Sequence, residues 1–131
     1  MTEATEGGLA ARVDTIEGAY EFMLAYAAQG RADEGDPALS QVRALLTAAA
    51  GALDGIDAAA REAFAAHPAR EKCAAFLDVL AEDARKALAA TRLTLSARSI
   101  SSQLVDNLNG SIHLRALLTD VFIVDEFLKN G

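Results

Sequence analysis

The chain has 131 residues, of which 52% are hydrophobic but only 5% are aromatic, and its formal net charge is −7 at pH 7. A chain of this length can bury a core without disulfides or metal ions. The acidic balance argues against nucleic acid and against an anionic membrane surface, because both require a basic face on the protein.

The N-terminus carries acidic residues where a secretory signal needs positive charge and an apolar segment. No uncharged run approaches the ~20 residues that span a bilayer. The single cysteine, Cys73, excludes an intramolecular disulfide and fits a reducing compartment. We therefore expect a soluble, cytoplasmic protein with neither a membrane nor a nucleic-acid partner.

Much of the hydrophobic share is alanine, the strongest helix former, so the composition favours an all-α protein. Residues 1–8 are polar and end in Gly-Gly, which predicts a disordered tail before one helical domain over 9–131. The first helix is expected over 9–29, with Gly30 after its end. Its apolar residues recur at three- and four-residue spacing, namely Val13, Ile16, Tyr20, Met23, Leu24 and Ala27.

Asp36-Pro37 is a helix start signal for the second helix, whose apolar stripe reaches Leu53. Either this helix continues to Phe64 or a short separate helix begins near Asp57. His67-Pro68 ends that segment, since the residue before proline avoids helical geometry.

The third helix carries an apolar face from Cys73 to Leu95, and Ser99 or Ser101 can cap the last helix. Each of these two helices is expected to be about 30 residues, or about 40 Å, long. Four main helices with short connections, and possibly a short fifth, predict an up-down helical bundle. Five arginines are dispersed along the chain and are interpreted as solvated surface: Arg12, Arg31, Arg43, Arg61 and Arg70.

The last helix has apolar residues on two faces. The broad face comprises Leu114, Leu117, Leu118, Val121, Phe122, Val124 and Leu128, and the narrower one Ile112, Ile123 and Phe127. A helix with two apolar faces packs on two sides, and in a small chain the second partner is often another copy or another protein. We therefore predict an interface at Ile112, Ile123 and Phe127, in a homodimer.

A set of polar residues lies between these faces: Asp106, Asn109, His113 and Asp120, which are collinear if the helix is unbroken through Gly110. Asp125 falls within the broad apolar face. Because burying a lone carboxylate is costly, Asp125 should be hydrogen-bonded, neutralised or near the end of the bundle.

Three interpretations of this polar set remain open. In the structural one, Asn109-Gly110 breaks the helix, Ser111 recaps it and His113 bonds locally. In the second, His113 accepts a phosphoryl group, with Arg115 compensating its charge and Asn109 positioning an oxygen.

The third interpretation is a metal or ligand site in the bundle core. The Glu-x-x-His pairs of di-iron bundles are absent, and two histidines with one cysteine form no spaced cluster. We accordingly predict neither a metal nor a cofactor. The sequence favours a non-enzymatic adaptor, regulator or assembly chaperone acting through protein contacts, with a phosphotransfer bundle using His113 or a ligand-binding bundle as alternatives.

Overall fold

The protein is an all-α structure, described over residues 8–130 by a computed structural model. Within that range it holds six α-helices, one 3₁₀ turn and no strand, so the all-α prediction is confirmed. The elements are α1 (Leu9–Ala28), η2 (Pro37–Leu39), α2 (Gln41–Leu53), α3 (Ile56–Ala63), α4 (Ala74–Leu95), α5 (Ser102–Gly110) and α6 (His113–Asn130). Apart from Gly8, the predicted tail over 1–8 lies outside the described residues.

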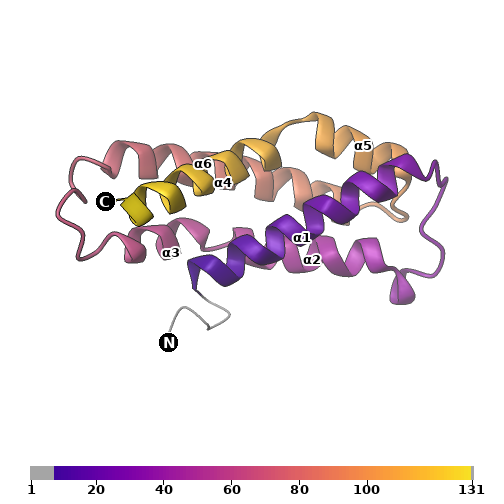
Figure 1. Cartoon of the computed structure of the whole chain (residues 1–131). Helices are drawn as coiled ribbons and strands as arrows, with labels where there is room; N and C mark the ends of the chain where they lie inside the picture. Colours follow the sequence, from indigo (N-terminus) through magenta and orange to yellow (C-terminus); the bar gives the residue numbers. More distant parts are fainter. Residues whose placement is uncertain (1–7, 131) are drawn as a thin grey trace.

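The helices lie side by side along one long axis (Figure 1). α1 packs mainly against α2 and α5, while α4 packs against α6 and α2. α4 and α6 run in opposite directions. The largest fully buried side chains come from all six helices and from the α4–α5 loop, and include Ile16, Met23, Leu46, Ile56, Leu80, Ile100, Val105, Leu117 and Val121.

The second helix begins later than the sequence predicts. The Asp36 carboxylate accepts a hydrogen bond from the Ala38 amide at 3.0 Å and starts only the short turn η2. Ser40 then caps α2, its Oγ accepting from the Arg43 amide at 3.1 Å. The start signal at Asp36-Pro37 is therefore real, but it initiates a 3₁₀ turn, and a second capping residue starts the α-helix.

The turn between α2 and α3 shows that the second segment is two helices. Gly55 has φ +107°, a conformation that favours glycine. The Arg12 guanidinium on α1 donates to the carbonyl oxygens of Gly51, Ala52 and Asp54 at 2.9–3.2 Å. Arg12 thus satisfies carbonyls that the end of α2 leaves unpaired, and interpreting it as a solvated arginine is wrong.

Glu34 and Arg43 form a buried ion pair at one end of the bundle. The Glu34 side chain is completely buried and accepts two hydrogen bonds of 2.8 Å from the Arg43 guanidinium. Arg43 also donates to the carbonyls of Leu95 and Ala97 at 2.9 and 3.0 Å. The hydrogen bonds from Arg43 lower the pKa of Glu34 to about 2, against the opposing effect of burial. Arg43 therefore joins α2 to the end of α4, and its interpretation as a surface arginine is also wrong.

Neighbouring polar groups complete this end of the bundle. The Glu34 carboxylate accepts a third hydrogen bond, of 2.5 Å, from the Ile100 amide, and the Tyr26 hydroxyl donates to the Ile100 carbonyl at 2.6 Å. The Ser102 hydroxyl donates to the Tyr26 carbonyl at 2.6 Å and accepts from the Arg31 amide at 2.8 Å. These bonds fix the loop after α1 against the loop before α5, which sets where α5 begins.

We expect Glu34→Gln to lower the free energy of unfolding at pH 7 by about 3 kcal/mol, because it leaves Arg43 without its counter-charge in a buried site. Since the folded pKa of about 2 lies below the ordinary 4.5, this stabilisation is complete above pH 4.5 and is lost as the pH falls towards 2. Urea unfolding between pH 7 and pH 2.5 measures it. Glu82→Gln, which breaks an exposed pair with Arg85, is the control and should change little. Equal effects of the two variants would contradict the account.

Candidate functional site

The last two helices carry the residues that the sequence singled out, and the structure separates them. α5 ends at Gly110 and α6 begins at His113, so the last segment is two helices, as in the structural interpretation of the polar set. The Ser111 amide and hydroxyl both donate to the Leu108 carbonyl, which closes the end of α5. The residue with positive φ is Ile112, at +61°, rather than Asn109 or Gly110.

The predicted polar residues do not form one stripe, because they lie on two helices. Asp106 is exposed on α5, and Asn109 is half-buried, its Oδ1 buried without a hydrogen-bond partner among the described residues. His113 is the half-buried first residue of α6. Asp125 is exposed near the C-terminal end and pairs with Lys129 at 3.2 Å. Asp125 is therefore not buried with the broad apolar face, and of the outcomes expected for it the structure gives a place near the end of the bundle.

Asp120 is the one residue of this set that is buried, at 7% exposure, and an acid on the facing helix, Asp83, affects its pKa. Burial raises the pKa of Asp120 to about 7, and the Asp83 carboxyl on α4 adds to the shift by hydrogen bonding to the protonated form and by repelling the ionised one. The Asp120 Oδ2 is buried without a hydrogen-bond partner among the described residues. Asp120 therefore keeps its proton to a higher pH than an exposed aspartate does.

Sequence reasoning missed Asp83 as the partner of Asp120. The signal was present, because Asp83 lies three residues after Leu80 and four before Ala87, which are both fully buried on α4. Pairing it with Asp120 requires the antiparallel register of α4 and α6, which periodicity alone does not give.

We expect Asp120 to make the protein less stable as the pH rises from about 4 to about 7, because the folded state holds a proton that the unfolded chain releases. Asp120→Asn should remove this dependence and raise the free energy of unfolding at pH 8 by on the order of 1–2 kcal/mol, well below the full value of the pKa shift because water reaches part of the site. Unfolding by urea at pH 5 and pH 8 measures the change. The exposed Asp106→Asn is the matched control. A variant with the same pH slope as the wild type would contradict the raised pKa of Asp120.

Ile112 combines a β-branched side chain with left-handed backbone geometry, although it is 52% exposed. That conformation costs about 1–2 kcal/mol for a residue other than glycine, asparagine or aspartate. Little burial within the monomer offsets this cost. Ile112 follows Ser111, the C-cap of α5, at the position where the end of a helix commonly has left-handed geometry.

We expect Ile112→Asn to raise the free energy of unfolding by about 1 kcal/mol, since asparagine tolerates positive φ. Ile123→Asn, at an exposed isoleucine with ordinary helical geometry, should lower it instead, because asparagine is the poorer helix former. Thermal and urea unfolding of dilute protein measure both variants. A loss of stability in Ile112→Asn would contradict the strain.

The predicted interface residues differ in how much of each side chain is already buried by contacts within the monomer. Ile123 is 50% exposed on the outer side of α6. Phe127 is 39% exposed, but its ring stacks on Phe64, with centroids 5.9 Å apart, and lies 5.3 Å from the His67 ring. Phe127 therefore also holds the ends of α3 and α6 together, so only part of its surface is available to a partner.

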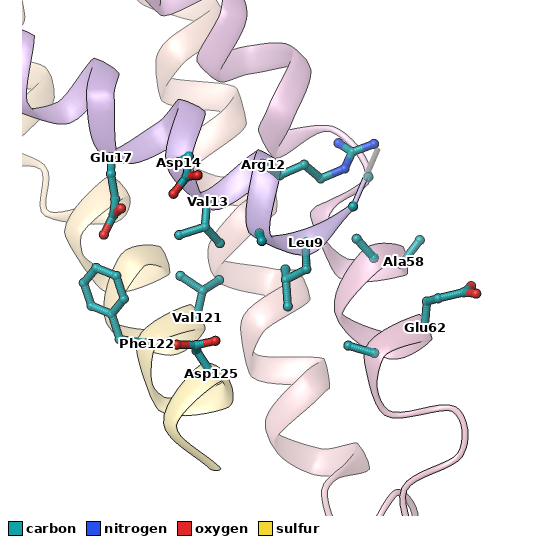
Figure 2. Close-up of a pocket in the computed structure, with 15 residues that line it drawn as sticks. Leu9, Arg12, Val13, Asp14, Glu17, Ala58, Glu62, Val121, Phe122 and Asp125 are labelled. Carbon is teal, nitrogen blue, oxygen red and sulfur yellow. The ribbon is translucent and has the colours of Figure 1, made fainter. Parts of the chain in front are cut away.

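An open groove of about 960 Å³ lies on the other side of α6, between the first turns of α1 and helix α3 (Figure 2). Leu9, Val13 and Val121 line it with apolar side chains, and Phe122 stands at its edge, 48% exposed. Its small residues are Ala10, Ala58, Ala59 and Ala63, and its acids are Asp14, Glu17, Glu62 and Asp125. Sequence reasoning placed Phe122 on the broad apolar face but did not find the groove, because three distant segments form it.

The structure offers little support for a metal or a phosphoryl group. Within residues 8–130, no group of three or more histidine, cysteine or acidic residues is arranged to hold a metal ion. In the same range no hydrogen bond joins the His113 imidazole to a carboxylate that would orient it, and Arg115 is exposed. None of the helices described is long and apolar enough to cross a membrane.

Comparisons with protein-family models, with curated proteins and with solved structures found no match for this chain. The features that bear on function are therefore the exposed side chains of α6 and the groove beside this helix.

Proposed function

We propose that the protein is a non-enzymatic adaptor, regulator or assembly chaperone that acts through protein contacts made by α6. The observation that carries this proposal is the set of large apolar side chains that α6 leaves exposed, of which Ile123 and Phe122 are each about half exposed. Phe122 and Ile123 lie on different sides of α6, and a third side of this helix packs in the core. Exposed apolar side chains gathered on one element are typical of a binding surface.

The outer side of α6 supports self-association. Ile123 and Phe127 are four residues apart, which places them on one side of α6, and Ile112 lies immediately before this helix. Val79, on the helix against which α6 packs, is 48% exposed as well. An isologous dimer would set this surface against the same surface of the second copy, so each apolar residue would be buried in both protomers.

The proposal also includes the finer architecture of the bundle. We propose four segments in an up-down arrangement, with α2 and α3 together as one segment and α5 and α6 together as another.

The positive φ at Ile112 also supports a partner contact at the outer side of α6. A side chain that is exposed in the monomer and adds backbone strain becomes favourable when a partner buries it, at roughly 25 cal/mol for each Å² removed from water. A cytoplasmic homodimer that also binds another protein accounts for both sides of α6. Phosphotransfer through His113 and a ligand-binding core stay predictions, since no contact in the structure favours either of them.

We expect Ile123→Lys to convert the dimer to a monomer, because a lysine at the centre of an apolar interface leaves a buried charge unpaired. Sedimentation velocity over a range of concentrations, with circular dichroism as the check on helicity, measures this. Phe127 is a poorer site for the test, since its ring also contacts Phe64 and His67.

Leu93→Lys is the matched control, because Leu93 is 73% exposed near the far end of α4 and the chemical change is the same. It should leave the mass unchanged. An unchanged mass in Ile123→Lys, or equal dissociation in both variants, would overturn self-association through this face.

A further inference from the structure

The groove beside α6 lies where one helix of the bundle begins. α1 starts at Leu9, part of the way along the long axis, and packs against both α3 and α6 (Figure 1). Figure 2 shows the Val13 side chain of α1 facing Val121 of α6, while the Leu9 side chain points into the space between α6 and α3. The open volume of about 960 Å³ at this point therefore continues the apolar interior of the bundle outward to the surface.

The lining of the groove suits a helix better than a compact ligand. Ala58, Ala59 and Ala63 on α3, with Ala10 on α1, present only methyl groups. Small side chains let a second helix approach to the 8–10 Å of normal helix packing without a clash. Phe122 at the opposite edge offers a large apolar ring that such a helix would cover.

The charges around the groove are acidic. Asp14 and Glu17 project from α1 beside Phe122, and Asp125 projects from α6 below it (Figure 2). Among the described residues, Asp14, Glu17 and Glu62 make no ion pair, and Asp125 pairs with Lys129. Arg12 is the one cation in the lining, and its guanidinium is directed at the carbonyls that end α2. The groove therefore combines an apolar floor with a negative rim.

We infer that this groove binds a cationic amphipathic helix of a partner protein. Leucine-like side chains of that helix would occupy the floor formed by Leu9, Val13 and Val121, and its lysines or arginines would meet Asp14 and Glu17. This inference rests on the proposed function, since it names the chemistry of the protein that is bound.

The acidic rim of the groove also argues against two other occupants, which are residues 1–7 of this chain and a second copy of the chain. Residues 1–7 contain Glu3 and Glu6 and no lysine or arginine, so this segment has the same sign as the rim. A second copy of the chain brings a net charge of −7 to a negative groove. Neither has the excess of lysine and arginine over acidic residues that the acidic rim favours in a partner.

The test uses the full chain and a synthetic helix of about 14 residues, about 21 Å long, made of leucine and lysine with the leucines on one face. Amide chemical-shift mapping locates the peptide, and titration calorimetry measures its affinity. A peptide with glutamate in place of every lysine is the charge control. Glu17→Lys and Asp106→Lys change the net charge equally, but only Glu17 lines the groove. Ala59→Phe, which fills the groove, serves as a second variant that leaves its charge intact.

We expect shifts to concentrate at Leu9, Val13, Ala59 and Val121, and the affinity to fall about tenfold in Glu17→Lys against less than about twofold in Asp106→Lys. Ala59→Phe should also weaken binding, and the glutamate peptide should not bind. Equal losses in the two charge variants, or shifts spread over the whole acidic surface, would overturn the inference. Shifts confined to Ile123 and Val79 would overturn the groove while supporting protein binding by α6, so the two proposals fail separately.

Discussion

The buried ion pair of Glu34 and Arg43 joins three segments of the bundle at one end. It is formed by a residue of the loop after α1 and a residue of the first turn of α2, and Arg43 reaches from there to the carbonyls of Leu95 and Ala97 at the end of α4. The Ile100 amide also donates to Glu34. A buried charge is costly when its donors and acceptors are unmatched, so this site disfavours other arrangements of the three segments.

The opposite end of the bundle is held in a different way. There the contacts are aromatic, between Phe64, His67 and Phe127, and the small side chains of α3 leave space that larger residues would fill. Polar contacts give one end a fixed geometry, while alanine and a partly exposed phenylalanine leave the other open. The two proposed binding surfaces, the groove and the outer side of α6, are both near this second end.

The repeating patterns of the sequence predicted the helices well. Apolar spacing gave α1 to within a residue, and Ser101 caps α5 as one of the two serines proposed, its Oγ accepting from the Leu104 amide at 3.0 Å. The third helix was expected to be longer than the 22 residues of α4, and a break near Gly110 was one of the interpretations left open. These features are local, because a cap or a stripe depends on residues less than two turns apart.

The features that the sequence did not reveal all depend on distant segments. The roles of Arg12 and Arg43 arise from carbonyls 39 to 54 residues away, and nothing in their own neighbourhood distinguishes them from Arg61, which makes an exposed pair with Asp78. The pairing of Asp83 with Asp120 needs the register of two helices. The groove is lined by residues of three helices, α1, α3 and α6. The left-handed conformation at Ile112 is a local exception, because residue preference alone would have placed that conformation at Asn109 or Gly110.

The most direct test of the central claim, that α6 is the protein-binding element, is hydrogen exchange of the unmodified chain at low and high concentration. Amides that a contact covers exchange more slowly once the contact forms. The account predicts that added protection at high concentration is confined to the second half of α6 and the facing first half of α4, while the end fixed by Glu34 is unchanged. Exchange that is independent of concentration throughout α6, or slowed equally in all helices, would contradict it.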